Sequence, residues 1–207
     1  MDTLVYSITE EKSDTLYVNL TNRCSNKCKF CIRSQKNDVC GHDMTIKNFD
    51  YSVDDIISQF ENFDIPNTIV FCGYGEPTLE LEKLKEFATY LKTNYPQIKI
   101  RVNTNGHANF VHRRDITVEL KNLVDEFSVS LNASDAVGYD YISNPNIPNA
   151  FEEVKKFIQS ATNSGIKTVA SVVTGFEDFD PNINNCKNIV SELGAELKIR
   201  EFIPNGY

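Results

Sequence analysis

Three cysteines lie close together near the amino terminus, in the stretch TNRCSNKCKFCIR. Cys24, Cys28 and Cys31 fall within eight residues of a 207-residue chain. This i, i+4, i+7 spacing would also place them on one face of a helix. A buried helical face needs apolar neighbours, yet between residues 22 and 36 only Phe30 and Ile32 supply them. We therefore expect the three thiols to bind a metal centre, because thiolates are soft ligands.

Two kinds of metal centre fit this spacing. A structural zinc ion takes four protein ligands, and Cys40 or His42 would supply the fourth. A [4Fe–4S] cluster held by three cysteines instead leaves one iron without a protein ligand. Such an open coordination position is how a metal centre admits a substrate or a cofactor. The other cysteines, Cys72 and Cys186, lie too far away in sequence to form a second ligand cluster.

Strands and helices alternate along the rest of the chain, and together they must position the cysteine segment. Alternating or β-rich patterns predict strands over residues 3–9, 15–21, 67–72, 98–103, 126–132, 166–173 and 195–203. Amphipathic patterns predict helices over residues 52–63, 79–95, 118–124, 149–165 and 182–194. Ser52 is a suitable N-cap residue, and Gly165 a suitable residue to end the fourth helix.

This repeated order of strand then helix favours a parallel sheet covered by helices. Eight such units would close a barrel, whereas the chain supplies six strands from residue 15 onward and one before it. We expect an α/β fold, an open partial (β/α)6 TIM-like barrel with an additional N-terminal strand. Residues 1–207 are expected to form a single core domain. In such folds the chemistry lies at the carboxyl ends of the strands.

Composition excludes some classes of function. The formal net charge is −8 and no basic run is present, which argues against non-specific nucleic-acid binding. No stretch approaches the roughly 18 apolar residues of a membrane span, and the amino terminus lacks the pattern of a signal peptide. We expect a cytoplasmic protein that does not bind a membrane. The three histidines have no metal-ligand spacing and are expected at the surface.

The Cys-x3-Cys-x2-Cys segment resembles that of the radical S-adenosylmethionine (SAM) superfamily, with an aromatic residue, Phe30, before the last cysteine and a strand before the first. In that family SAM chelates the open iron of a [4Fe–4S] cluster. An electron from the cluster then splits SAM, and the 5′-deoxyadenosyl radical abstracts hydrogen from a substrate. The resemblance implies an oxygen-sensitive enzyme with Phe30 beside its cofactors. It also implies an electron donor such as a flavodoxin or a ferredoxin.

The same resemblance assigns residues at the other strand ends. In CGYGEPT, Glu76 matches the family acid that accepts from the ammonium group of SAM, and Gly75 matches the glycine before it. Tyr74 stands where the family has another glycine, so Gly73 is expected to let the ligand approach instead. The remaining matches are Asn103 and Asn105 near the methionine end, and Ser130, Asn132 and Arg200 near ribose and adenine.

Several functions remain open at this stage. The segment LYVNLTNRCSNKCKFCIR resembles a small subgroup associated with TatD-like hydrolases, which implies such a hydrolase as a functional partner. A short, open barrel favours a protein or peptide substrate, and a small-molecule enzyme resembling deazaguanine synthases is the alternative. From another class, the chain could be a non-catalytic iron–sulfur electron-transfer protein or a zinc-binding module. Neither explains the polar residues at the strand ends, and no residue is assigned as catalytic.

Overall fold

The computed structural model describes residues 2–9, 14–36 and 38–204. Its main feature is a seven-stranded sheet in the order β1-β2-β5-β6-β7-β8-β9. The strands are β1 (Val5–Tyr6), β2 (Thr15–Val18), β5 (Thr68–Phe71), β6 (Lys99–Thr104), β7 (Glu126–Ser130), β8 (Lys167–Thr174) and β9 (Glu196–Glu201). β1 is antiparallel to β2, and every other neighbouring pair is parallel. β1 and β9 are the two edges, so the sheet is open, which confirms the expected partial barrel with an additional N-terminal strand.

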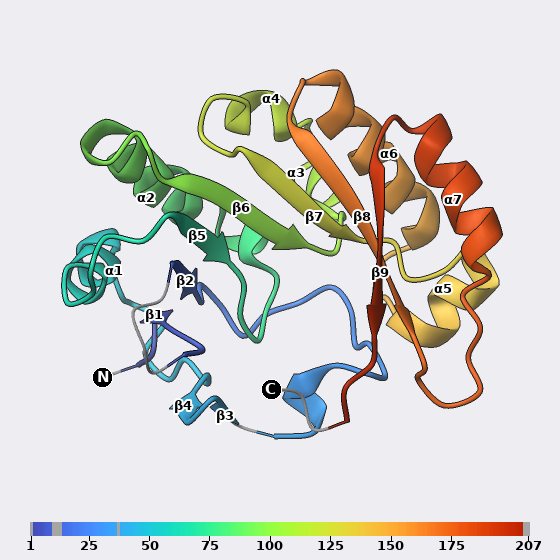
Figure 1. Cartoon of the computed structure of the whole chain (residues 1–207), viewed down its shortest axis with the longest axis horizontal. Coiled ribbons are helices and arrows are strands. Elements are labelled where there is room, and N and C mark those ends of the chain that lie inside the picture. The colour runs from blue at the N-terminus through green and yellow to red at the C-terminus, as the bar shows by residue number, and fades with distance from the viewer. Residues whose placement is uncertain (1, 10–13, 37, 205–207) are drawn as a thin grey trace.

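Helices pack along one side of this sheet, as Figure 1 shows. They are α1 (Val53–Phe60), α2 (Leu81–Asn94), α3 (Ala108–His112), α4 (Thr117–Leu120), α5 (Ala136–Ser143), α6 (Ala150–Asn163) and α7 (Ile183–Glu192). The expected cap of α1 is confirmed, since Ser52 accepts from the Asp55 N–H and Asp55 accepts from the Ser52 N–H. Gly165 follows the end of α6 with φ +80°, as predicted. None of these helices is long and apolar enough to cross a membrane among the residues described.

Alternate residues of each strand face opposite sides of the sheet, and the two sides differ in character. The helix side carries the main core, with Phe71 of β5, Val102 of β6 and Phe127 of β7 fully buried. The opposite side, here called the concave face, carries polar residues. Asn103 of β6 and Ser128 of β7 are register partners there. The sheet therefore has one face built for packing and one available for chemistry.

Some elements were absent from the sequence-based expectation. These are α3, α5, the hairpin β3 (Asp38–Val39) with β4 (His42–Asp43), and the short 3-10 helices η1 (Ile32–Ser34) and η2 (Pro77–Glu80). They are short, so periodicity gives them little signal. The cysteine segment lies between β2 and η1, on the side of the strands away from α2, α6 and α7 in Figure 1.

Candidate active site at the carboxyl ends of the strands

The cysteine segment is docked by its backbone onto the end of α5. The Lys27 N–H donates to the Ser143 carbonyl at 3.0 Å, and the Lys29 N–H donates to the Ile142 carbonyl at 3.0 Å. In return, the Asn146 N–H donates to the Ser25 carbonyl at 2.9 Å. Because backbone groups make these contacts, they position the loop whatever side chains it carries.

The three thiols are partly buried and unpaired with any other cysteine. Burial, together with the neighbouring Cys31 and Cys24, raises the pKa of Cys28 to about 12. Burial also raises the pKa of Cys24, whose sulfur accepts from the Asn26 N–H at 3.4 Å and from the Asn105 amide at 3.6 Å. Thiolates in such a site need positive charge nearby, which an iron–sulfur cluster supplies.

No three His, Cys, Asp or Glu side chains of the described residues converge tightly enough to share one metal ion. The thiolates of a [4Fe–4S] cluster need not do so, because each binds a different iron. The chemistry of this donor set therefore fits such a cluster, with Cys24, Cys28 and Cys31 as the residues that would hold it.

A buried hydrogen-bond network lies beneath the cysteine segment. The Asn105 amide donates to Ser25 Oγ at 2.8 Å, and Ser25 Oγ lies 2.8 Å from His107 Nδ1. His107 Nε2 lies 3.0 Å from the Tyr139 hydroxyl, which also accepts from the Asn26 amide at 3.1 Å. The network therefore links the turn after β6 and the helix α5 to Ser25 and Asn26, the two residues directly after Cys24.

The expectation that His107 lies at the surface was wrong, since its side chain is 1% exposed. His107 follows the turn after β6, where Gly106 has φ +78°, and the chain passes directly under the cysteine segment. The missed signal was its position, because a polar residue right after a strand-end turn of a parallel sheet lies near the site.

Burial of His107 predicts a loss of stability in acid. Burial lowers its pKa from 6.5 to about 4. Between these values the unfolded chain binds a proton that the folded chain does not, so the free energy of unfolding falls as the pH drops from about 6.5 to about 4. We expect His107→Gln to be less stable than wild type at pH 7 but to lose less stability between pH 7 and pH 5. Urea unfolding at both pH values measures this, and equal losses in both proteins would contradict it.

Glu76 is the buried acid at the end of β5. Its side chain accepts four hydrogen bonds, from the Thr78 N–H (3.2 Å), the Thr78 hydroxyl (2.7 Å), the Thr104 hydroxyl (2.8 Å) and the Asn105 N–H (2.7 Å). Burial raises the pKa of Glu76, and these donors act in the opposite direction. The first three bonds go to Oε1 and only the last to Oε2, so Oε2 keeps room for a further donor.

The glycines before Glu76 allow close approach of protein to protein. A Cβ on Gly75 would lie 2.2 Å from the Thr21 carbonyl oxygen and 2.5 Å from that of Arg23. A Cβ on Gly73 would lie 2.1 Å from Asn19 Oδ1. Both glycines therefore let the Glu76 segment pack against the chain that leads into the first cysteine, where the Glu76 N–H donates to the Arg23 carbonyl at 2.8 Å.

Tyr74 points away from this contact. Its buried ring packs in a small apolar cluster with Tyr6 and Met44, and its hydroxyl donates to the Lys36 carbonyl. Its own carbonyl accepts from the Arg33 guanidinium at 3.3 Å. Tyr74 thus anchors the segment that follows the cysteines.

The other residues predicted to bind cofactor differ in burial and in their contacts. Asn132 is buried with φ +61° and donates to Ser143 Oγ at 3.1 Å. Phe30 packs edge-on against Phe176 with ring centroids 6.0 Å apart. Ser130 is half-buried at the end of β7, and Arg200 is exposed on β9. The structure therefore brings Glu76, Asn105 and Asn132 into the hydrogen-bonded surroundings of the cysteine segment. Arg200 lies on the edge strand.

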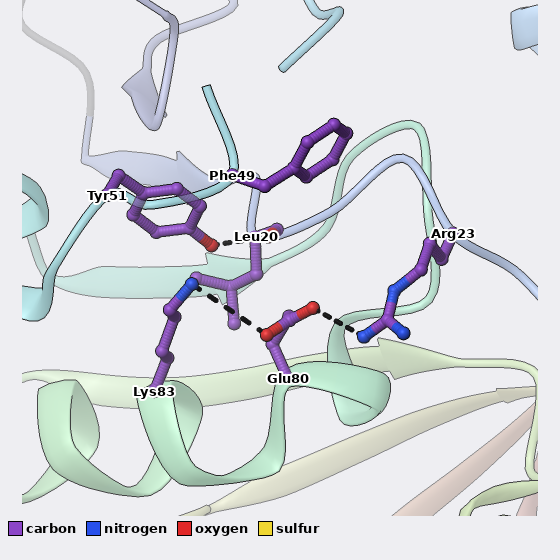
Figure 2. A pocket seen from close by; sticks show the side chains of 6 residues that line it. All are labelled: Leu20, Arg23, Phe49, Tyr51, Glu80 and Lys83. Atoms are coloured by element: carbon purple, nitrogen blue, oxygen red, sulfur yellow. Dashed lines mark hydrogen bonds and ion pairs between the residues drawn. The ribbon is translucent and has the colours of Figure 1, made fainter. Parts of the chain in front are cut away.

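A surface pocket of about 350 Å³ lies beside this site, next to the start of α2 (Figure 2). Its charged side chains are paired with one another. Arg23 contacts Glu80 at 2.7 Å, and the Lys83 ammonium lies 3.8 Å from Glu80 and 3.7 Å from the Tyr51 ring centroid. None of the residues predicted to bind cofactor lines it.

Comparisons with known proteins agree with this geometry. A family model described as the radical SAM superfamily matches residues 18–183. The chain is 26% identical over 214 residues to a dual-specificity RNA methyltransferase RlmN of Buchnera aphidicola subsp. Schizaphis graminum, covering 93% of this chain and 54% of that protein. It is 30% identical over 192 residues to a probable GTP 3′,8-cyclase of Methanococcus maripaludis, covering 90% of this chain and 58% of that protein. The chain thus spans about half the length of these curated relatives.

Solved structures share the fold at low sequence identity. SuiB of Streptococcus suis bound to S-adenosylmethionine superposes with a TM-score of 0.68 at 16% identity, covering 92% of this chain and 41% of that one. SuiB bound to its precursor peptide SuiA gives 0.66 at 17% identity, covering 92% and 40%. Since the family model matches well over half of its residues, the chain belongs to the radical SAM superfamily, whose enzymes use a [4Fe–4S] cluster and SAM.

Proposed function

We propose that this radical SAM enzyme cleaves SAM reductively and abstracts a hydrogen atom from a protein or peptide substrate. Cys24, Cys28 and Cys31 would hold the [4Fe–4S] cluster. When bound, the cluster supplies the electron that breaks the sulfonium bond of SAM. The protein contributes hydrogen bonds to the Cys24 sulfur from the Asn26 N–H and the Asn105 amide. Donors to a ligating sulfur favour the thiolate and tune the reduction potential of a cluster.

The observation that carries this proposal is the free acceptor position on Glu76 Oε2. The carboxylate is 3% exposed and is fixed by donors from three residues, so it cannot turn away. A charged ammonium group is the donor that such a buried carboxylate binds best. The Glu76 segment also packs against the chain leading into Cys24. We propose that Glu76 accepts from the ammonium group of SAM, with Ser130 and Asn132 contacting its ribose.

The concave face with its polar residues supports a substrate that binds across the strands. A structural neighbour with this fold binds a precursor peptide. A small-molecule substrate is the second candidate, because a probable GTP 3′,8-cyclase is among the relatives.

Radical SAM enzymes need an electron donor, and the surface around the cysteines fits an acidic one. No Asp or Glu occurs between residues 22 and 36, whereas five basic residues do, against a net charge of −8 for the whole chain. Arg23, Lys27 and Lys29 are exposed. We propose that a flavodoxin or ferredoxin docks here, because complementary charge speeds association.

The test is the detection of 5′-deoxyadenosine. The chain is reconstituted anaerobically with iron and sulfide, reduced with dithionite and incubated with SAM. We expect 5′-deoxyadenosine by mass spectrometry, and none from the Cys28→Ala protein treated in the same way. A fully loaded, reducible cluster that leaves SAM intact would contradict the proposal and favour an electron-transfer protein.

A further inference from the structure

Arg101 is a cation without a partner on the concave face. Its Nε is buried and makes no hydrogen bond, and its guanidinium forms no ion pair with any described residue. The adjacent acid contacts another cation, since Glu126, the register partner of Arg101 on β7, is paired with Lys167 at 3.0 Å. An unpaired charge that is partly buried lowers the free energy of unfolding. Such a charge is therefore a candidate for pairing with a bound ligand.

A second unpartnered atom lies on the same face of β6. Asn103, two residues beyond Arg101, has a buried Oδ1 without a hydrogen-bond donor. Arg101 and Asn103 thus offer a ligand hydrogen-bond donors and a hydrogen-bond acceptor from the same face of one strand. Few buried side-chain atoms of the described residues lack a partner, and two of them lie here side by side on one strand face.

Arg200 lies on the same side of the sheet as Arg101, three strands away on β9. It lies on the concave side of β9, as the register partner of Val173, and the described residues provide it with no ion pair. Burial raises the pKa of the Cys72 thiol, at the end of β5, while Asn103 and the charges of Arg200 and Arg101 lower it.

We propose that Arg101 binds an anionic group of the substrate on the concave face. A guanidinium presents parallel N–H groups that match the paired oxygens of a carboxylate or a phosphate. The whole chain is acidic, with a net charge of −8, so an unpaired guanidinium on this face is a local feature. Asn103 Oδ1 would accept an N–H or O–H next to the anionic group, a substrate contact in place of the SAM contact that the family resemblance implies. This assignment rests on the proposed function, because it places the substrate beneath SAM.

Both carboxylates and phosphates fit this chemistry, and the experiment separates them. The cluster-loaded enzyme, saturated with SAM, is titrated by calorimetry with pyrophosphate in one arm and with a short peptide containing glutamate in the other. We expect one of the two to bind wild type, and Arg101→Met to weaken it at least 10-fold, as expected for lost charged hydrogen bonds. Arg113→Met is the matched control, since it removes an equal charge from an exposed site beyond α3.

The outcomes distinguish this inference from the proposed function. Uncoupled formation of 5′-deoxyadenosine and the affinity for SAM should be the same in Arg101→Met and wild type. Failure of both probes to bind wild type would overturn the inference. Equal affinity of Arg101→Met and wild type for the probe that binds would also overturn it. So would a loss of SAM affinity in Arg101→Met, which would assign Arg101 to the cofactor. A wild-type enzyme that binds the anion yet fails to cleave SAM would overturn the proposed function and leave the anion site standing.

Discussion

Replacing Cys28 with alanine is expected to abolish the iron–sulfur cluster and all cleavage of SAM. Three thiolates hold three irons, and loss of one leaves a second iron without a protein ligand. Cys28 lies between the other two cysteines in the sequence, and after burial these two are the main causes that raise its pKa. The brown absorbance after anaerobic reconstitution and the paramagnetic resonance signal after reduction should both fall to background. Cys24→Ala and Cys31→Ala should behave in the same way.

Cys40→Ala is the matched control for these variants. Cys40 is exposed on the hairpin after η1, and the described residues place it in no metal-binding group. We expect this variant to keep its full complement of iron, and Cys72→Ala to do likewise. If the Cys28→Ala protein retained a complete cluster, the three-cysteine assignment would be wrong. Loss of the cluster in Cys40→Ala as well would indicate a fourth thiolate ligand.

Sequence reasoning predicted the sheet because its signals are local and repeated. Each long strand is a β-rich run of residues, and each long helix has an apolar stripe, so the order of strands and helices follows from periodicity. The cap at Ser52 and the turn at Gly165 depend on the chemistry of one residue each, and both are confirmed. An open sheet follows in turn, because six parallel strands are too few for a closed barrel.

The surroundings of the site were less predictable, because they depend on contacts between distant segments. His107 reaches Ser25 across 82 positions and Tyr139 across 32 positions in the sequence. The helix α5, which carries Tyr139 and supports the cysteine segment, has only a short and weak apolar pattern. The sequence does not reveal that Arg101 Nε lacks a hydrogen-bond partner either. This depends on the three-dimensional contact of the neighbouring Glu126 with Lys167.

Glu76→Gln is expected to weaken SAM binding roughly 10- to 150-fold. The variant keeps the size of the side chain but removes the charge that an ammonium group would meet, and hydrogen bonds to charged groups contribute about 1.5–3 kcal/mol. The thiolates are unchanged, so the cluster should form normally. Titration of the reduced protein with SAM, followed by electron paramagnetic resonance, measures cluster content and affinity in one sample.

The Glu76→Gln substitution should also affect the free energy of unfolding, so a control variant is needed. Backbone N–H groups of Thr78 and Asn105 bind different oxygens of Glu76, whereas a glutamine offers only one oxygen. One buried N–H is then left facing an amide NH2, which should lower the free energy of unfolding by about 1–3 kcal/mol. Thr104→Val separates the two effects, because it removes a donor to Oε1 while leaving the charge and the free position on Oε2 intact. We expect Thr104→Val to lose stability yet bind SAM within about threefold of wild type, a change of under 1 kcal/mol. Equal weakening of SAM binding in both variants would mean that Glu76 only shapes the turn after β5, and that another group meets the ammonium.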